Sequence, residues 1–167
     1  MPWELIVVKY DGKPPRLQRD SDKSRQLPLG TLDEVRDHIS TVLPDIEWCV
    51  EPSLIEMMKA IGSDSWKNWD EQMLADASKP KLRATWIRDD MSFEMFGFEQ
   101  DGPLRFFLLD VRGGENPLPL LRALCETKGW SIAEMGKDGE YLDLTGSAAQ
   151  DRWDGWQRYL SAAINRK

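Results

Sequence analysis

The fold is decided by Ser92–Lys128, which reads SFEMFGFEQDGPLRFFLLDVRGGENPLPLLRALCETK. Two aromatic, apolar runs in this stretch flank Asp101-Gly102, a dipeptide typical of tight hairpin turns because both residues tolerate positive φ. With a loop of only those two residues, we expect Phe96 to pair with Phe107. A register shift of one residue would exchange the two faces of the hairpin.

Both faces of the expected hairpin are mostly apolar, which is typical of strands that are covered on both sides. Either this chain packs on each face, or one face is kept for a partner. The predicted register places Glu94, Phe96, Phe98, Arg105, Phe107, Leu109 and Val111 on one face, and Phe93, Met95, Glu99, Leu104, Phe106, Leu108, Asp110 and Arg112 on the other.

An Arg-Gly-Gly turn follows the hairpin and leads into a helix that Asn116 can cap. Such a turn can bind an anion through free N–H groups and the helix dipole, and the candidate anion-binding residues are Arg112, Gly113, Gly114 and Asn116. The alternative is a purely structural turn, with Arg112 paired to a carboxylate on its own strand face. The acidic Glu115 and the absence of any Gly-x-Gly-x-x-Gly or Gly-Lys-Ser/Thr pattern favour this alternative.

The rest of the chain predicts strands and helices without a regular βαβ alternation. The order therefore indicates one α+β domain over residues 1–167, with a mainly antiparallel sheet packed by helices, and argues against a doubly wound nucleotide fold. We expect strands over Trp3–Tyr10, Ile46–Val50, Leu82–Arg88, Ser131–Met135 and Glu140–Leu144, a long loop over 11–28, helices after the capping residues Thr31 and Ser53, one helix over 66–77, a helical insertion over 53–79 and a C-terminal helix over 147–165.

The composition favours an acidic globular protein with many aromatic residues. The chain has 167 residues, a formal net charge of −7 and eight tryptophans. A strong acidic excess argues against nucleic acid and anionic membranes as partners, and is compatible with a basic protein partner. The first residues lack a basic leader and a long apolar run, and no stretch approaches a membrane span. We therefore expect a cytoplasmic protein, with Cys49 and Cys125 reduced and buried.

No arrangement of residues in the sequence predicts a catalytic or metal site, and none calls for a cofactor. The single histidine, His38, is expected on a solvated helix face, and the two cysteines lack zinc-ligand spacing. A carboxylate pair could support acid–base chemistry if burial separated the two pKa values, with salt bridges and strand edges as the alternative. The carboxylates on or beside expected strands are Glu94, Asp110, Glu134, Glu140 and Asp143.

Four pieces of the chain resemble a family of small uncharacterised bacterial proteins. They are LPLGTLDEVRDHISTVLP (27–44), SFEMFGF (92–98), FFLLDVRGGENPLPLLRALCETKGW (106–130) and GEYLDL (139–144), with VRGG, NP and GW as the most specific elements. Leu54–Lys79 and the Trp-rich tail look like additions to that pattern. The resemblance implies the accessory proteins found with polymorphic toxins, many of which are immunity proteins, and it implies no catalytic residues.

Our leading hypothesis is a non-enzymatic, immunity-type inhibitor that sequesters a basic bacterial toxin. The expected partner-binding residues lie in the helical insertion, with Trp66, Trp69 and Met73 as apolar anchors and Asp64, Asp70 and Glu71 around them. The alternative for each aromatic residue is a place in the core. Two other functions remain open: an anionic-ligand or enzymatic domain that uses the Arg112–Asn116 turn, and a subunit that covers a sheet face by self-association.

Overall fold

A computed structural model describes residues 1–17, 23–136 and 139–164 of the chain. Within them, one antiparallel sheet and five α-helices confirm the expected α+β fold. The strands are β1 (Trp3–Tyr10), β2 (Gln26–Leu27), β3 (Glu47–Glu51), β4 (Lys81–Arg88), β5 (Met91–Phe96), β6 (Phe106–Gly113) and β7 (Trp130–Glu134). The helices are α1 (Leu32–Val42), α2 (Leu54–Ala60), α3 (Glu71–Ala77), α4 (Leu118–Glu126) and α5 (Ser147–Ile164), with short 3₁₀ helices η2 (Lys23–Arg25) and η3 (Ser65–Asn68).

The strand β1 pairs with other strands along both of its edges. The order β1-β6-β5-β4-β3 runs from it in one direction, and β7 pairs with its other edge. Lys9 pairs with Leu27 of β2 and with Trp130 of β7, so β2 continues the ladder beyond the end of β6. Every pairing is antiparallel.

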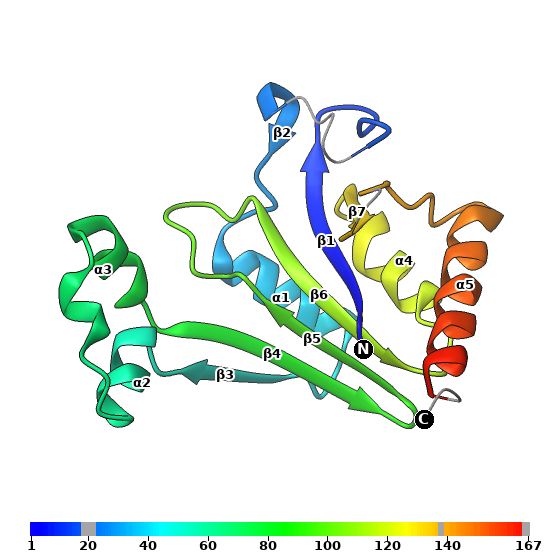
Figure 1. Cartoon of the computed structure of the whole chain (residues 1–167). Helices are drawn as coiled ribbons and strands as arrows, with labels where there is room; N and C mark the ends of the chain where they lie inside the picture. Colours follow the sequence, from blue (N-terminus) through cyan, green and yellow to red (C-terminus); the bar gives the residue numbers. More distant parts are fainter. Residues whose placement is uncertain (18–22, 137–138, 165–167) are drawn as a thin grey trace.

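The hydrophobic core lies between one face of this sheet and the helices α1, α4 and α5. In Figure 1, α1 lies behind β5 and β6, and α4 and α5 lie beside β1 and β7. Side chains at alternate strand positions point into this layer because successive residues of a strand face opposite sides. The largest fully buried side chains are Trp3, Leu5, Ile39, Leu43, Phe93, Met95, Leu104, Phe107, Leu109, Leu121, Leu124 and Ile132.

The predicted register of the β5–β6 hairpin is wrong by one residue. Phe96 pairs with Leu108, and the connection spans 97–105 instead of two residues. Gly97 leaves the strand with φ +86°, and the Gln100 side chain then holds the wide loop by donating to the carbonyls of Gly97 and Phe106. Consequently the core face of the hairpin carries Met91, Phe93, Met95, Phe107, Leu109 and Val111, and the other face carries Ser92, Glu94, Phe96, Phe106, Leu108, Asp110 and Arg112.

The segment between β3 and β4 is helical, and it projects from the end of the sheet as a separate lobe (Figure 1). The capping boxes of Thr31 with Glu34 and Ser53 with Glu56 are both present, as predicted. The expected single helix over 66–77 is wrong, since the 3₁₀ turn η3 ends before Asp70, which caps α3 with its own side chain. We call residues 53–79 the helical lobe.

Two other expectations need correction. The Glu140–Leu144 strand is reduced to a loose pairing with β7, in which Glu134 N–H donates to the Glu140 carbonyl and Leu142 N–H donates to that of Ile132. Residues 137–138, between the expected strands Ser131–Met135 and Glu140–Leu144, lie outside the described part of the chain, as do 18–22 of the long loop and 165 of the last helix. Cys49 is exposed instead of buried, because it points to the sheet face that lacks helices.

Candidate protein-binding face

A row of carboxylates crosses the sheet on the side away from the helices. In the ladder, Asp110 of β6 lies directly opposite Glu4 of β1 and directly opposite Glu94 of β5. The same row continues through Thr85 of β4 to Glu47 of β3. Like charges at directly opposed positions destabilise a sheet. We call Glu4, Asp110, Glu94 and Glu47 the acidic row.

The electrostatics of the acidic row are unfavourable in the isolated chain. Partial burial raises the pKa of Asp110, and the neighbouring Glu4 and Glu94 raise it further. Arg112 opposes this effect, but its guanidinium lies 3.7 Å from Glu94 and 3.9 Å from Asp110 and is half exposed. Two exposed arginines, Arg112 and the more distant Arg83, thus partly compensate three carboxylates, and exposed pairs of this kind contribute little.

An apolar band lies beside the acidic row. In the next row of the ladder, Ile6 faces Leu108, and Leu108 faces Phe96. These side chains and Phe106 are all half-buried, although they belong to the middle of the sheet. The guanidinium of Arg83 lies 6.0 Å from the ring centroid of Phe96 at the far end of the band. The apolar band consists of Ile6, Phe96, Phe106 and Leu108.

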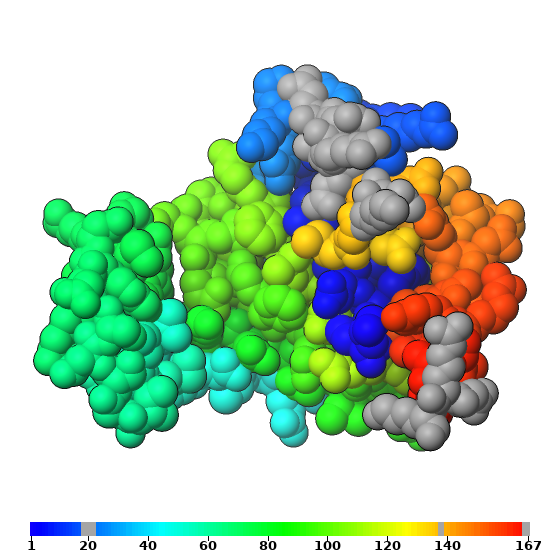
Figure 2. Space-filling model, viewed as in Figure 1, coloured from blue at the N-terminus to red at the C-terminus, as the bar shows by residue number. Residues whose placement is uncertain are grey.

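No helix of the described chain covers this side of the sheet. Figure 1 is viewed from this side, with the strands in front of α1, and Figure 2 shows β1 and the hairpin at the molecular surface between the helical lobe and α5. At the lower end of the face, Ile87 is 73% exposed. Of the two alternatives for the hairpin, the described residues place helices on only one face, and on this side burial is limited to the region near β2 and β7, where Val8, Tyr10 and Ala133 are buried. We call the acidic row and the apolar band together the open face.

The predicted anchors in the helical lobe are partly used within the lobe. Trp66 donates its indole N–H to the Ser63 carbonyl and lies under the ammonium of Lys59 at 5.0 Å. Asp64 pairs with Lys67, and Asp70 accepts the backbone N–H of Met73. Trp69 is half-buried, whereas Glu71 and Met73 are exposed. The lobe also exposes Leu54, Met57 and Ile61, and only Ser53 and Ile55 of its residues are buried.

The Arg-Gly-Gly turn is occupied by a group of the protein itself. The Gly114 N–H donates to both the backbone carbonyl and the side-chain carboxylate of Asp90, each at 3.0 Å. A Cβ atom on Gly113 would lie 1.7 Å from the Asp90 carbonyl oxygen, so this glycine is required by close packing. Arg112 points to the open face instead of the turn. Asn116 accepts the Leu118 N–H, but the predicted cap is wrong by one residue, since α4 begins at Leu118 and Pro117 is its N-cap.

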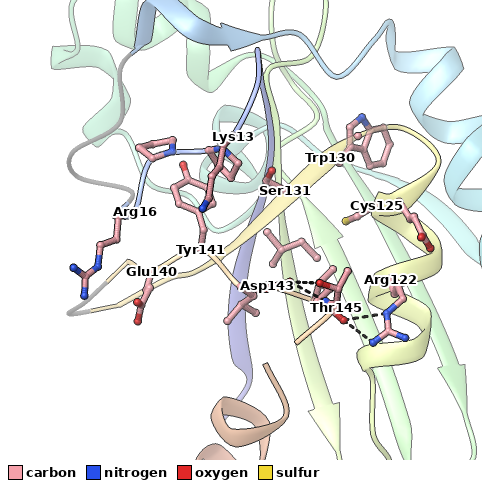
Figure 3. Close-up of a pocket in the computed structure, with 17 residues that line it drawn as sticks. Lys13, Arg16, Arg122, Cys125, Trp130, Ser131, Glu140, Tyr141, Asp143 and Thr145 are labelled. Atoms are coloured by element: carbon pink, nitrogen blue, oxygen red, sulfur yellow. Dashed lines mark hydrogen bonds between the residues drawn. The ribbon is translucent and has the colours of Figure 1, made fainter. Parts of the chain in front are cut away.

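A pocket lies at the outer edge of β7 (Figure 3). Its volume is about 900 Å³. The walls come from the 13–16 loop, the end of α4, the start of β7 and the segment 140–145. Arg122 fixes that segment by donating from Nε and Nη2 to the Leu144 carbonyl at 3.0 and 2.5 Å.

The remaining candidate chemical groups have structural partners. His38 is not solvated as expected: its Nε2 lies 2.7 Å from the Leu124 carbonyl, and its ring meets Trp130 edge-on, so it ties α1 to α4. Burial raises the pKa of Cys125, which favours the neutral thiol. Glu134 and Glu140 both pair with Arg152. Among the described residues, the indole N–H of Trp130 is buried without a hydrogen-bond partner.

Comparisons with known proteins identify no relative of this chain. No family model, no curated protein and no solved structure matches the chain. The resemblance to small bacterial accessory proteins therefore rests on the quoted motifs alone. In the described residues, no helix has the length and apolarity to span a membrane, and no group of three or more potential ligands is arranged to hold a metal ion.

Sequence reasoning missed the open face because it did not know the strand order. Glu94 and Asp110 were considered only as members of a possible acid–base pair, on opposite faces of the expected hairpin, and Glu4 and Glu47 were not considered at all. The available signal was the alternation in β1, where Glu4 and Ile6 share one face and Leu5 and Val7 share the other. That alternation shows which residues face outward, but the opposition of charges appears only once β1 is placed beside β6.

Proposed function

We propose that this protein is a non-enzymatic binding module whose open face docks on a basic protein. The observation that carries the proposal is the acidic row, in which three carboxylates are held directly opposite one another on a sheet face that no helix of the described chain covers. Folding alone gains nothing from this arrangement, since the isolated sheet would be more stable with neutral side chains there. A partner's lysine or arginine side chains would remove the repulsion and form charge-assisted hydrogen bonds.

The apolar band supports a protein partner over a free cation. Half-exposed Ile6, Phe96 and Leu108 form a contiguous surface next to the charges, and interfaces combine such apolar centres with charged surroundings. The exposed methionine and isoleucine side chains of the helical lobe would extend the contact. A second copy of this chain suits the face less well, because symmetric docking brings the two acidic patches together.

The specific role that we propose is an immunity-type inhibitor that sequesters a basic toxin. A net charge of −7 would speed association with such a partner. This role agrees with the resemblance in the sequence. The binding proposal does not depend on this role, since any basic protein would satisfy the open face.

The test is capture of the partner from the native host with three forms of the protein. Wild type and Glu115→Lys, which reverses an exposed loop carboxylate away from the sheet, should capture the same basic protein. Glu94→Lys should bind it at least about tenfold more weakly, because the charge reversal lies inside the acidic row. The captured protein is then purified, its affinity measured by calorimetry, and its toxicity assayed with and without the chain.

A folded Glu94→Lys variant that binds as tightly as wild type would contradict the proposal, and so would an acidic partner. Circular dichroism establishes that the variant is folded. A basic partner that binds through the open face but has no toxic activity would support the proposed binding module. It would contradict the proposed inhibitor role.

A further inference from the structure

The pocket lies where the segment 140–145 stops pairing with β7. The last hydrogen bond between these two segments is the one that the Leu142 N–H donates to the Ile132 carbonyl at 2.8 Å. Beyond it, the chain turns at Asp143 toward α4, where Arg122 holds the Leu144 carbonyl. The space that remains, about 900 Å³, is in the upper part of the range of small-molecule sites.

The inner walls of the pocket are mostly apolar. Ile132 is fully buried at its floor, and Leu142 and Leu144 pack on the core from the outer segment. Cys125 contributes a neutral thiol, since burial raises its pKa. Pro14 and its neighbour Pro15 complete the opposite wall. Such walls suit the hydrocarbon part of a ligand and offer no nucleophile.

The charged groups around the pocket differ in whether they already have partners within the protein. The Asp143 carboxylate accepts from both the N–H and the hydroxyl of Thr145, which lowers its pKa, and Glu140 pairs with Arg152. Lys13 and Arg16 form no side-chain hydrogen bond or ion pair with the described residues, although the charge of Lys13 helps to lower the pKa of Asp143. Figure 3 shows Lys13 extending toward Tyr141, and Arg16 at the rim.

Lys13 and Arg16 thus lack a hydrogen-bonded partner among the described residues, whereas two of the three nearby carboxylates are already bound. The third, Glu126, is exposed. The pocket is lined by three cations, Lys13, Arg16 and Arg122, and by three carboxylates, so its charge is balanced although the whole molecule carries a net charge of −7. We propose that this pocket binds a small amphipathic carboxylate, with its hydrocarbon chain against the inner walls and its carboxylate at Lys13. The proposal is independent of the protein-binding role of the open face.

Three eight-carbon compounds that differ only in the head group test this proposal. Octanoate, 1-octanol and octylamine are titrated into the full-length protein by calorimetry, and the backbone amides of Ser131 and Thr145 are followed by NMR. Octanoate should bind about tenfold more tightly than 1-octanol, and octylamine more weakly than both. Lys13→Gln should remove the advantage of octanoate over 1-octanol, while the matched exposed control Lys23→Gln should leave it unchanged.

Leu142→Trp, which fills the pocket, should abolish binding of both octanoate and 1-octanol. The proposal is overturned if octanoate gives no heat and no amide shifts up to about 10 mM. A specific site of this size should have a dissociation constant below that concentration. It is also overturned if 1-octanol binds as tightly as octanoate, or if a folded Lys13→Gln variant retains the preference.

Discussion

At the scale of single residues, Gly113 is the position least able to change. Its φ is +106°, and an added Cβ would collide with the Asp90 carbonyl at 1.7 Å. Gly113→Ala should therefore lower the free energy of unfolding by about 3 kcal/mol in urea denaturation. Gly12→Ala is the matched control, since Gly12 also has positive φ but no atom near its Cβ, and it should cost about 1 kcal/mol. Equal losses in the two variants would show that the Asp90 contact is not formed.

Asp110 should make the stability of the protein depend on pH in an unusual direction. Its pKa is raised by burial and by Glu4 and Glu94, so the folded protein holds this proton to a higher pH than the unfolded chain does. Stability attributable to Asp110 therefore falls as pH rises from the ordinary value of 3.8 through the raised pKa. Asp110→Asn should stabilise the protein by about 0.5–1 kcal/mol at pH 7 and lose this advantage at low pH.

The control for this prediction is Glu115→Gln, which removes a carboxylate that lies outside the acidic row. It should leave the free energy of unfolding within about 0.5 kcal/mol of wild type at both pH values. If thermal denaturation at pH 7 shows Asp110→Asn to be less stable than wild type, the repulsion in the acidic row is not the dominant effect there.

At the scale of elements, the helical lobe should be the least stable part of the described chain. Both α2 and α3 have seven residues, and Ile55 is the only apolar side chain of the lobe that is buried. Local opening needs little loss of buried surface, so amide hydrogen exchange in α2 and α3 should require about 2 kcal/mol less than exchange in β6. Equal protection of the lobe amides and the β6 amides against exchange would contradict local opening of the lobe.

Local sequence patterns predicted the elements of this fold well where each depends on its own residues. The capping boxes of Thr31 and Ser53 and the β1 strand all follow from local chemistry. The hairpin register was not predictable from Asp101-Gly102, because the Gln100 side chain stabilises a longer loop through contacts made only after folding. The open face could not be predicted for a similar reason, since it depends on β1 lying beside β6.

At the scale of the whole molecule, salt should act in opposite directions on folding and on binding. The isolated chain carries a charge of −7, and its acidic row is repulsive, so raising the salt concentration from about 10 to 150 mM should raise the melting temperature by screening. The affinity for a basic partner should fall over the same range, because the attraction is screened too. Calorimetry of the free protein and of the complex measures both effects. Affinity that is insensitive to salt would argue against an electrostatic interface.

Carboxylate footprinting of the complex is the most direct test of the open face as the docking surface. Carbodiimide coupling of glycinamide, followed by mass spectrometry, labels exposed acidic side chains in the free protein and in the complex. Glu4 and Glu94 should be labelled in the free protein and protected in the complex, while Glu115 should stay labelled in both. Unchanged labelling of Glu4 and Glu94 in a saturated complex would show that the partner binds elsewhere.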